Sequence, residues 1–252
     1  MFVFLDDCWR ESCAPGKQPE PNPGEHNSGW AKDPGILYFG PCGSGCEYAE
    51  DTTAIVTLLE EYVKDVMTTF KDDKRIFAWD LYNEPGGGQD PHRYYMRTFP
   101  LLKSIFGWAR EVNPSQPLTA GIWHSSLGEM NVWQIENSDI ITYHTYEPLE
   151  SHQALVDTLK KYNRPMVCTE YMARTQNSTF QSIMPMLKKE NVGAINWGFV
   201  SGKTNTIFSW ETIITPCPTE EPELWFHDIL RKDGTPYCEE ETACIKNLTG
   251  KE

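Results

Sequence analysis

The chain alternates short, mostly apolar runs with longer stretches in which apolar residues recur at helical spacing. The short runs are expected to be β-strands because of their length and apolar character. They cover residues 1–7, 75–85, 117–123, 140–148, 165–172 and 193–200. Helices are expected over the amphipathic stretches, at residues 53–73, 99–115, 127–137, 151–163, 179–192 and 223–231.

Three residues mark the limits or the shape of predicted helices. Pro114 is expected to end one helix, and Ser151 is expected to be the N-cap of another. Pro185 is expected to kink a third helix, because proline lacks the N–H that a helix interior needs. Residues 8–50 are rich in Pro, Gly and Cys and too long for an ordinary connection, which indicates a functional loop.

Strand and helix alternate six times along the chain. Continuously apolar strands separated by helices are typical of a parallel sheet covered by helices, so the sequence predicts an α/β fold. A chain of 252 residues supports one sizeable core, which favours a single domain over residues 1–252. A dinucleotide-binding sheet is disfavoured because the chain has no GxGxxG turn after a strand.

The charge and the aromatic content narrow the choice of partners. The net charge is −14 and the pI about 4.9, whereas nucleic acids and anionic membranes bind basic faces, so neither is expected as a partner. No apolar segment is long enough to cross a membrane. The nine Trp suit a cleft that stacks flat polar ligands. Four of them are expected in the core: Trp79, Trp108, Trp133 and Trp225.

Eight cysteines are many for a cytosolic enzyme. Most lie in polar segments rich in Gly and Pro, which predicts disulfide-linked loops and an extracellular or secretory location. These are Cys8, Cys13, Cys42, Cys46, Cys217, Cys238 and Cys244. A zinc site is disfavoured, because no pair has zinc-knuckle spacing. Cys168 lies in an apolar run and is expected to be a buried free thiol.

Polar and aromatic residues gather where the predicted strands end. Active sites of β/α barrels are built at the carboxyl ends of parallel strands, from several strands at once. The sequence therefore predicts a (β/α)8 TIM-barrel fold with about six βα units present. The residues at these strand ends are Asp6, Asp7, Asn83, Glu84, Trp123, His124, His144, Tyr146, Glu147, Glu170, Tyr171, Asn196 and Trp197.

Two carboxylates, Glu84 and Glu170, each follow an apolar strand and precede a loop. Glycoside hydrolysis needs such a pair, because one group protonates the leaving oxygen while the other attacks the anomeric carbon or activates water. Either residue taken alone is better explained as an ion-pair partner or a helix N-cap. The position of both at strand ends favours catalysis.

Four strand ends carry a resemblance to a known family: WDLYNEPG at 79–86, ITYHTYEP at 141–148, VCTEYM at 167–172 and INWGFV at 195–200. They resemble strands four, six, seven and eight of clan A glycoside hydrolases, and most of all glycoside hydrolase family 5, the cellulase-like group. The resemblance covers essentially the whole chain. Its specific feature is an Asn-Glu-Pro followed 86 residues later by a second Glu.

The resemblance implies roles for the matching residues. Glu84 would be the general acid/base, and Glu170 would be the nucleophile of a retaining double displacement. Asn83 would bind the sugar 2-hydroxyl, and Tyr146 would hydrogen-bond Glu170 and help to keep it ionised. The mechanism requires no metal and no cofactor.

Further substrate contacts are implied with less specificity. His144 would line the mouth of the barrel near the acid/base, and Trp197 would stack against the sugar. Weaker candidates for the substrate cleft lie in loops or at strand ends, and they are equally well explained as core or ordinary loop residues: Trp9, His26, Asn27, Trp30, Trp123 and His124. For Asp6 and Asp7 an N-cap or a salt bridge is the better explanation.

The chain departs from the family pattern at its start. It opens at what corresponds to the third strand, so the first two βα units are expected to be missing, together with an Arg that usually orders the nucleophile. A fragment of a longer protein would also explain why no signal peptide is visible, although sequons at Asn177 and Asn247 are compatible with secretion.

The expected function is that of a monomeric O-glycosyl hydrolase (EC 3.2.1.-) that cleaves a β-linked poly- or oligosaccharide with retention. The sugar, and endo or exo action, do not follow from the sequence. The alternative is a non-catalytic carbohydrate-binding protein or an inactive barrel fragment, which the presence of both carboxylates disfavours.

Overall fold

The computed structural model describes residues 1–6, 20–28, 51–86, 97–216 and 221–250. It divides into two compact units, of which unit 1 comprises Met1–Lys17 and Ala31–Thr142. Unit 2 comprises Gln18–Trp30 and Tyr143–Glu252. Most of the predicted functional loop at 8–50 lies outside the described residues, as do Asp7, Trp9, Trp30 and five of the cysteines.

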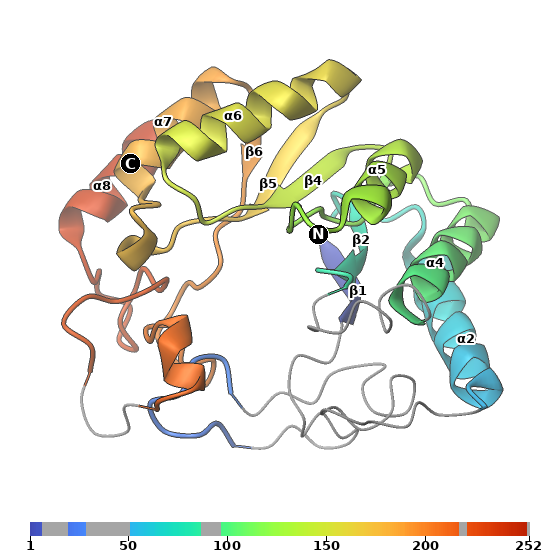
Figure 1. Ribbon diagram of the computed structural model, residues 1–252, viewed down its shortest axis with the longest axis horizontal. Coiled ribbons are helices and arrows are strands. Elements are labelled where there is room, and N and C mark those ends of the chain that lie inside the picture. Colours follow the sequence, from blue (N-terminus) through green and yellow to red (C-terminus); the bar gives the residue numbers. More distant parts are fainter. Residues whose placement is uncertain (7–19, 29–50, 87–96, 217–220, 251–252) are drawn as a thin grey trace. The chain divides into compact units, whose positions relative to one another are not determined.

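Unit 1 contains a parallel three-stranded sheet in the order β1-β2-β3. Its strands are β1 (Phe2–Asp6), β2 (Trp79–Asn83) and β3 (Leu118–Thr119). Its helices are α2 (Thr53–Phe70), α4 (Phe99–Val112) and α5 (Gly128–Asn137), and α2 and α4 lie side by side (Figure 1). Each element lies within a range that the sequence predicts, although β3 is much shorter than expected.

The core of unit 1 forms around β2, whose residues Trp79, Leu81 and Tyr82 are fully buried. A parallel strand buried on both faces shows no alternation of apolar and polar positions, and in β2 even Asp80 is buried. The one polar group of the Trp79 ring is satisfied, because its Nε1–H donates to Gln116 Oε1 at 3.0 Å. Trp108 is also buried in this core and Trp133 packs against it, as predicted.

The sheet of unit 2 has the order β4-β5-β6, and β4 crosses the boundary between the units. Its strands are β4 (Ile141–His144), β5 (Met166–Glu170) and β6 (Gly193–Ala194). The helices are α6 (Leu149–Leu159), α7 (Phe180–Lys189) and α8 (Glu239–Thr249), and α7 packs against both of the others (Figure 1). Short 3-10 helices cover Lys160–Tyr162, Arg174–Gln176 and Trp210–Ile213.

The helix predicted at 223–231 is wrong. Leu230 forms bridges with Val200 and Pro236, and the backbone N–H groups of Phe226 and His227 donate to carbonyl groups around residue 206. Five consecutive residues, 225–229, are buried, so this stretch has no polar face on which a surface helix depends. Hydrogen bonds to distant backbone segments replace the helical ones.

Helix α8 was not predicted. It has only scattered apolar residues, but Glu239, Glu240 and Glu241 occupy its first turn, where they complement the helix dipole. It ends at Gly250, whose φ of +69° is the left-handed conformation common after a helix.

The predicted N-cap Ser151 is also wrong. Helix α6 begins two residues earlier, at Leu149, and Ser151 is exposed inside it. The N-cap is Pro148, which is tolerated at a helix start because its missing N–H would find no helical partner there. Pro185 lies inside α7, as the sequence predicts, and the kink expected there stays a prediction. Helix α7 begins with a capping box between Thr179 and Ser182.

Cys168 is a buried free thiol, as predicted. Cys238 and Cys244 are also free, so the disulfides expected for them are not present. Asn177 and Asn247 are exposed. Among the helices in the described ranges, none combines the length and the apolar character that a membrane crossing requires.

Candidate active site

In unit 1 the carboxyl ends of β1 and β2 lie in register, with Asp6 beside Asn83. The Asn83 Nδ2–H group donates to Asp6 Oδ1 at 3.3 Å, so the carboxylate orients the amide. Asp6 thus has a hydrogen-bond partner at the end of the neighbouring strand.

Glu84 follows β2 directly and has a φ of +43°. Few non-glycine residues adopt the left-handed region, because Cβ crowds the backbone there, and such residues cluster at functional sites. The Glu84 backbone therefore turns abruptly out of the strand before Pro85, and the side chain remains half-buried.

The end of β3 leads to a second pair of predicted residues in unit 1. Trp123 Nε1–H donates to the carbonyl oxygen of Pro85 at 3.1 Å, so this half-buried indole lies against the turn that follows Glu84. The His124 ring lies 5.1 Å from the Trp123 ring, but it is exposed and its Nδ1 is 2.7 Å from Ser126 Oγ in its own loop. The structure brings Trp123, and not His124, to the Glu84 turn.

In unit 2 the ends of β4 and β5 bring three predicted residues together. Tyr146 Oη donates to Glu170 Oε2 at 2.6 Å, which is the hydrogen bond that the resemblance implies. His144 Nδ1 lies 3.5 Å from the same oxygen. His144 is the last residue of β4 and Tyr146 lies two residues beyond it, and both side chains reach the same carboxylate.

Glu170 lies at a sheltered strand end. Its side chain is 14% exposed and that of His144 is 4% exposed. The Thr145 N–H donates to the Glu170 carbonyl oxygen at 3.1 Å and fixes the end of β5 against β4. Charge-assisted hydrogen bonds are stronger where solvent is excluded, so the Tyr146 hydroxyl is well placed to stabilise an ionised Glu170.

His26 and Asn27 lie in a buried turn of unit 2. His26 is buried, with 4% of its surface exposed, and its Nδ1–H donates to the Phe208 carbonyl oxygen at 2.7 Å. Asn27 has a φ of +48°, and its N–H donates to the Thr204 carbonyl oxygen. These contacts explain both residues as parts of the scaffold, and any contact of theirs with a sugar stays a prediction.

Trp197 lies in the loop after β6 and is half-buried. The next residue, Gly198, has a φ of +87°, and a Cβ there would lie 2.7 Å from the His227 Cβ. Only glycine fits this approach, so the loop that carries Trp197 is tied closely to the segment 225–230.

His227 and Trp210 lie beside Tyr146 but were not predicted as site residues. Their rings lie 5.2 Å and 5.1 Å from the Tyr146 ring. His227 falls in the segment wrongly predicted as a helix, and no motif surrounds it. A histidine inside an apolar run was the one available signal, and it is more often a core residue than a site residue.

Burial controls the charge of two histidines in unit 2. Desolvation lowers the pKa of His227 to about 3, and the nearby His26 and Arg174 add to this effect. Desolvation also lowers the pKa of His152 to about 4. Both rings are therefore neutral near pH 7.

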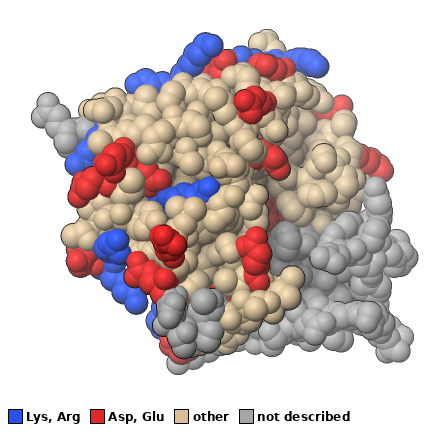
Figure 2. Space-filling model, turned by 60° about the vertical axis from the view of Figure 1, so that its left-hand side comes forward, with Lys and Arg blue, Asp and Glu red and all other residues tan. Residues whose placement is uncertain are grey.

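On the face in Figure 2, acidic and basic side chains are interspersed among the described residues.

The sequence of the chain matches one known protein family. The profile of the family described as cellulase (glycosyl hydrolase family 5) matches residues 26–202. No curated protein sequence matches the chain.

Several solved structures are similar to the chain. A GH2 β-galacturonidase from Eisenbergiella tayi matches at 12% identity and a TM-score of 0.53, over 80% of this chain and 38% of that one. A Bifidobacterium dentium β-glucuronidase matches at 15% identity and 0.54, over 77% and 34%. CbXyn10B matches at 10% identity and 0.50, over 86% and 73%.

At these identities the structures share the fold, which is that of the TIM-barrel glycoside hydrolases, as predicted. The chain spans little more than a third of the first two. The family profile covers more than half of the chain, and it includes Glu84, Glu170 and the residues around them. The chain therefore belongs to the cellulase family, glycosyl hydrolase family 5.

Proposed function

We propose that this chain is a catalytic domain that hydrolyses β-linked poly- or oligosaccharides with retention of configuration. The observation that carries the proposal is the 2.6 Å hydrogen bond from Tyr146 Oη to Glu170 Oε2 in a chain of family 5. A nucleophilic carboxylate must be ionised and held in one orientation, and a phenol that donates to one oxygen supports both.

In the proposed reaction, Glu170 attacks the anomeric carbon and a glycosyl ester forms as the bond to the leaving oxygen breaks. Glu84 gives its proton to that leaving oxygen in the same step. Glu84 then accepts a proton from water, the water oxygen attacks the anomeric carbon, and Glu170 leaves as a carboxylate. The enzyme regains both of its starting protonation states.

The substrate contacts are proposed from the same strand ends. Asn83, oriented by Asp6, would donate to the sugar 2-hydroxyl, whose hydrogen bonds strengthen in the transition state. His144 is close to the Glu170 carboxylate and would line the subsite of the cleaved sugar. Trp197 and Trp123 are half-buried, so each could present an indole face to a sugar ring.

Trapping with 2-deoxy-2-fluoro β-glycosides bearing a dinitrophenyl leaving group tests this proposal. A panel of glucosyl, mannosyl and xylosyl probes should add one glycosyl unit to Glu170, as located by peptide mass spectrometry. Glu170→Gln should abolish the adduct, and Glu150→Gln, at an exposed position on α6, should leave it unchanged. An adduct on Glu170→Gln at the wild-type rate would refute the assigned nucleophile.

Glu84→Gln separates the acid/base from the nucleophile. A dinitrophenolate leaves without protonation, so the variant should still form the adduct but turn it over slowly, and azide should restore turnover as a β-glycosyl azide. An α-glycosyl azide would rule out retention. In a crystal structure, retention requires a separation of about 5–5.5 Å between the two carboxyl groups.

A further inference from the structure

We propose that His227 is a positioning residue for Glu170, which holds the backbone turn after the nucleophile and supports the phenol of Tyr146. This inference rests on the proposed function, since it deepens the role given there to Glu170. His227 lies 57 positions after Glu170 and outside the region that the family profile matches.

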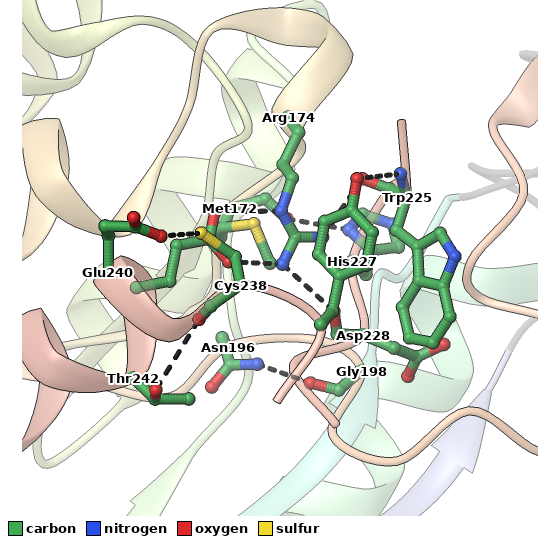
Figure 3. A network of polar contacts seen from close by, with 12 residues as sticks. Met172, Arg174, Asn196, Gly198, Trp225, His227, Asp228, Cys238, Glu240 and Thr242 are labelled. Atoms are coloured by element: carbon green, nitrogen blue, oxygen red, sulfur yellow. Dashed lines mark hydrogen bonds and ion pairs between the residues drawn. The ribbon is translucent and has the colours of Figure 1, made fainter. Parts of the chain in front are cut away.

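The first contact is a hydrogen bond to the turn after β5. His227 Nδ1 lies 2.7 Å from the Met172 carbonyl oxygen (Figure 3). A carbonyl oxygen only accepts, so Nδ1 carries the proton. Met172, two residues after Glu170, has a φ of +73°, which is unfavourable for a residue with a side chain. Strained backbone persists only where its surroundings hold it, and His227 supplies one such restraint.

The second contact is with the ring that binds Glu170. The His227 and Tyr146 rings lie 5.2 Å apart and are tilted by 43°, while Trp210 meets Tyr146 edge-on at 5.1 Å. The phenol of Tyr146 therefore has aromatic neighbours that limit its movement. Because its hydroxyl donates to Glu170 Oε2, a shift of the ring would displace the nucleophile as well.

Charge and burial favour positioning over proton transfer. His227 is fully buried, and desolvation lowers its pKa to about 3. The ring is therefore neutral near pH 6.5, where an exposed histidine would be half-protonated. Within the described part of the chain, its Nε2 is buried and has no hydrogen-bond partner. Nδ1 is thus the atom through which His227 acts.

The segment around His227 is itself held in place. Arg174 donates to the carbonyl oxygens of Trp225 and Asp228, each at 3.0 Å, on either side of His227 (Figure 3). The Arg174 guanidinium also pairs with Glu241, from α8. His227 is therefore fixed before substrate binds, as a positioning residue must be.

Two amide substitutions separate the roles of the two ring nitrogens. The amide nitrogen of Asn superposes on Nδ1, so His227→Asn keeps the donor to Met172. Gln places its amide nitrogen near Nε2, where the structure offers no partner, so His227→Gln loses that donor. The two variants are similar in polarity and differ in the hydrogen bond to the Met172 carbonyl oxygen.

With the fluorosugar probes, His227→Gln should form the adduct about three- to tenfold more slowly, the effect of losing one buried hydrogen bond, with little change in probe affinity. His227→Asn should stay within about twofold of the wild type. Phe226→Leu is the packing control, because Phe226 contacts the His227 ring at 4.1 Å; it should lower the melting temperature and leave the trapping rate unchanged. Equal trapping rates for the Gln and Asn variants would overturn the proposal.

Crystal structures of the two variants give a readout that does not depend on turnover. In His227→Gln the Met172 turn should shift and the Tyr146–Glu170 hydrogen bond should lengthen, whereas both should persist in His227→Asn. An unchanged hydrogen bond in the Gln variant would overturn the role of His227, even if no probe labels the chain. Failure of every probe to label the wild type would instead refute the proposed function. If His227→Gln does not fold, a folded His227→Asn variant that forms the adduct slowly would overturn the positioning role of His227.

Discussion

At the scale of single residues, both candidate carboxylates lie beside backbone in the left-handed region. Glu84 has a φ of +43°, and Met172, just after Glu170, has a φ of +73°. Both positions lie within two residues of the end of a strand, where the chain turns away from the sheet. The sequence identifies the two carboxylates but gives no sign of this backbone conformation, since neither position is a glycine.

The contact between Tyr146 and Glu170 predicts a large effect of one hydroxyl. A hydrogen bond to a charged group contributes about 1.5–3 kcal/mol, so Tyr146→Phe should slow adduct formation by roughly 10- to 150-fold. The measurement is the trapping rate with the fluorosugar probe, at a pH where the wild type is fully active.

Tyr143→Phe is the matched control, because Tyr143 lies in β4, three residues before Tyr146. The Tyr143 hydroxyl is 3.0 Å from His152 Nε2 and makes no contact with Glu170 among those described. Its loss should reduce the free energy of unfolding by about 1 kcal/mol and leave the trapping rate unchanged. Equal trapping rates for the two variants would contradict the role of Tyr146.

At the scale of elements, Arg174 holds both α8, through a buried ion pair, and the segment 225–230, through hydrogen bonds to its backbone. Arg174 follows β5, and its guanidinium donates to both carboxylate oxygens of Glu241, at 2.9 and 2.6 Å. Both side chains are less than 10% exposed. Such a pair links α8 to the loop that also holds the backbone on either side of His227.

Glu241→Ala should therefore destabilise the chain strongly. It leaves a buried guanidinium without its carboxylate, for which about 3–5 kcal/mol is the usual cost. Glu20→Ala removes the partner of Lys203 in a pair whose side chains are 77% and 80% exposed, and it should cost at most about 1 kcal/mol. Urea unfolding at constant pH compares the two, and similar midpoints would show that the Arg174 pair does not stabilise the fold.

At the scale of the whole molecule, two buried histidines make the free energy of unfolding depend on pH. The folded pKa of His227 is about 3 and that of His152 about 4, whereas an unfolded histidine titrates near 6.5. Below about pH 6.5 the unfolded chain takes up protons that the folded chain does not, so the free energy of unfolding falls as the pH falls toward 4.

His227→Asn removes one of these two groups and should flatten this decline. Between about pH 6 and pH 4.5, the slope of the unfolding free energy should decrease by up to about 1.4 kcal/mol per pH unit relative to the wild type. Denaturation at a series of pH values measures the slope for both proteins. The same slope in both would mean that His227 is not held neutral in the folded state.

The sequence by itself determined the order of strands and helices from β1 to β6, the family, and the two residues, His144 and Tyr146, that lie beside Glu170. These follow from local features: the apolar character of strands such as β2 and β5, and the polar residues at their carboxyl ends. His144 and Tyr146, which lie two residues apart at the end of β4, also reach the same carboxylate.

Only the tertiary structure decided the conformation of 225–230, the position of α8 and the place of His227. The backbone of that segment bonds to residues about 20 to 30 positions earlier, including Phe199 and Thr206, so its periodicity carried no reliable signal. Hydrogen bonds and packing supplied by distant segments outweigh local preference, which amounts to less than about 1 kcal/mol per residue for ordinary residues. For the same reason, a buried histidine that no motif marks lies beside the phenol that holds the proposed nucleophile.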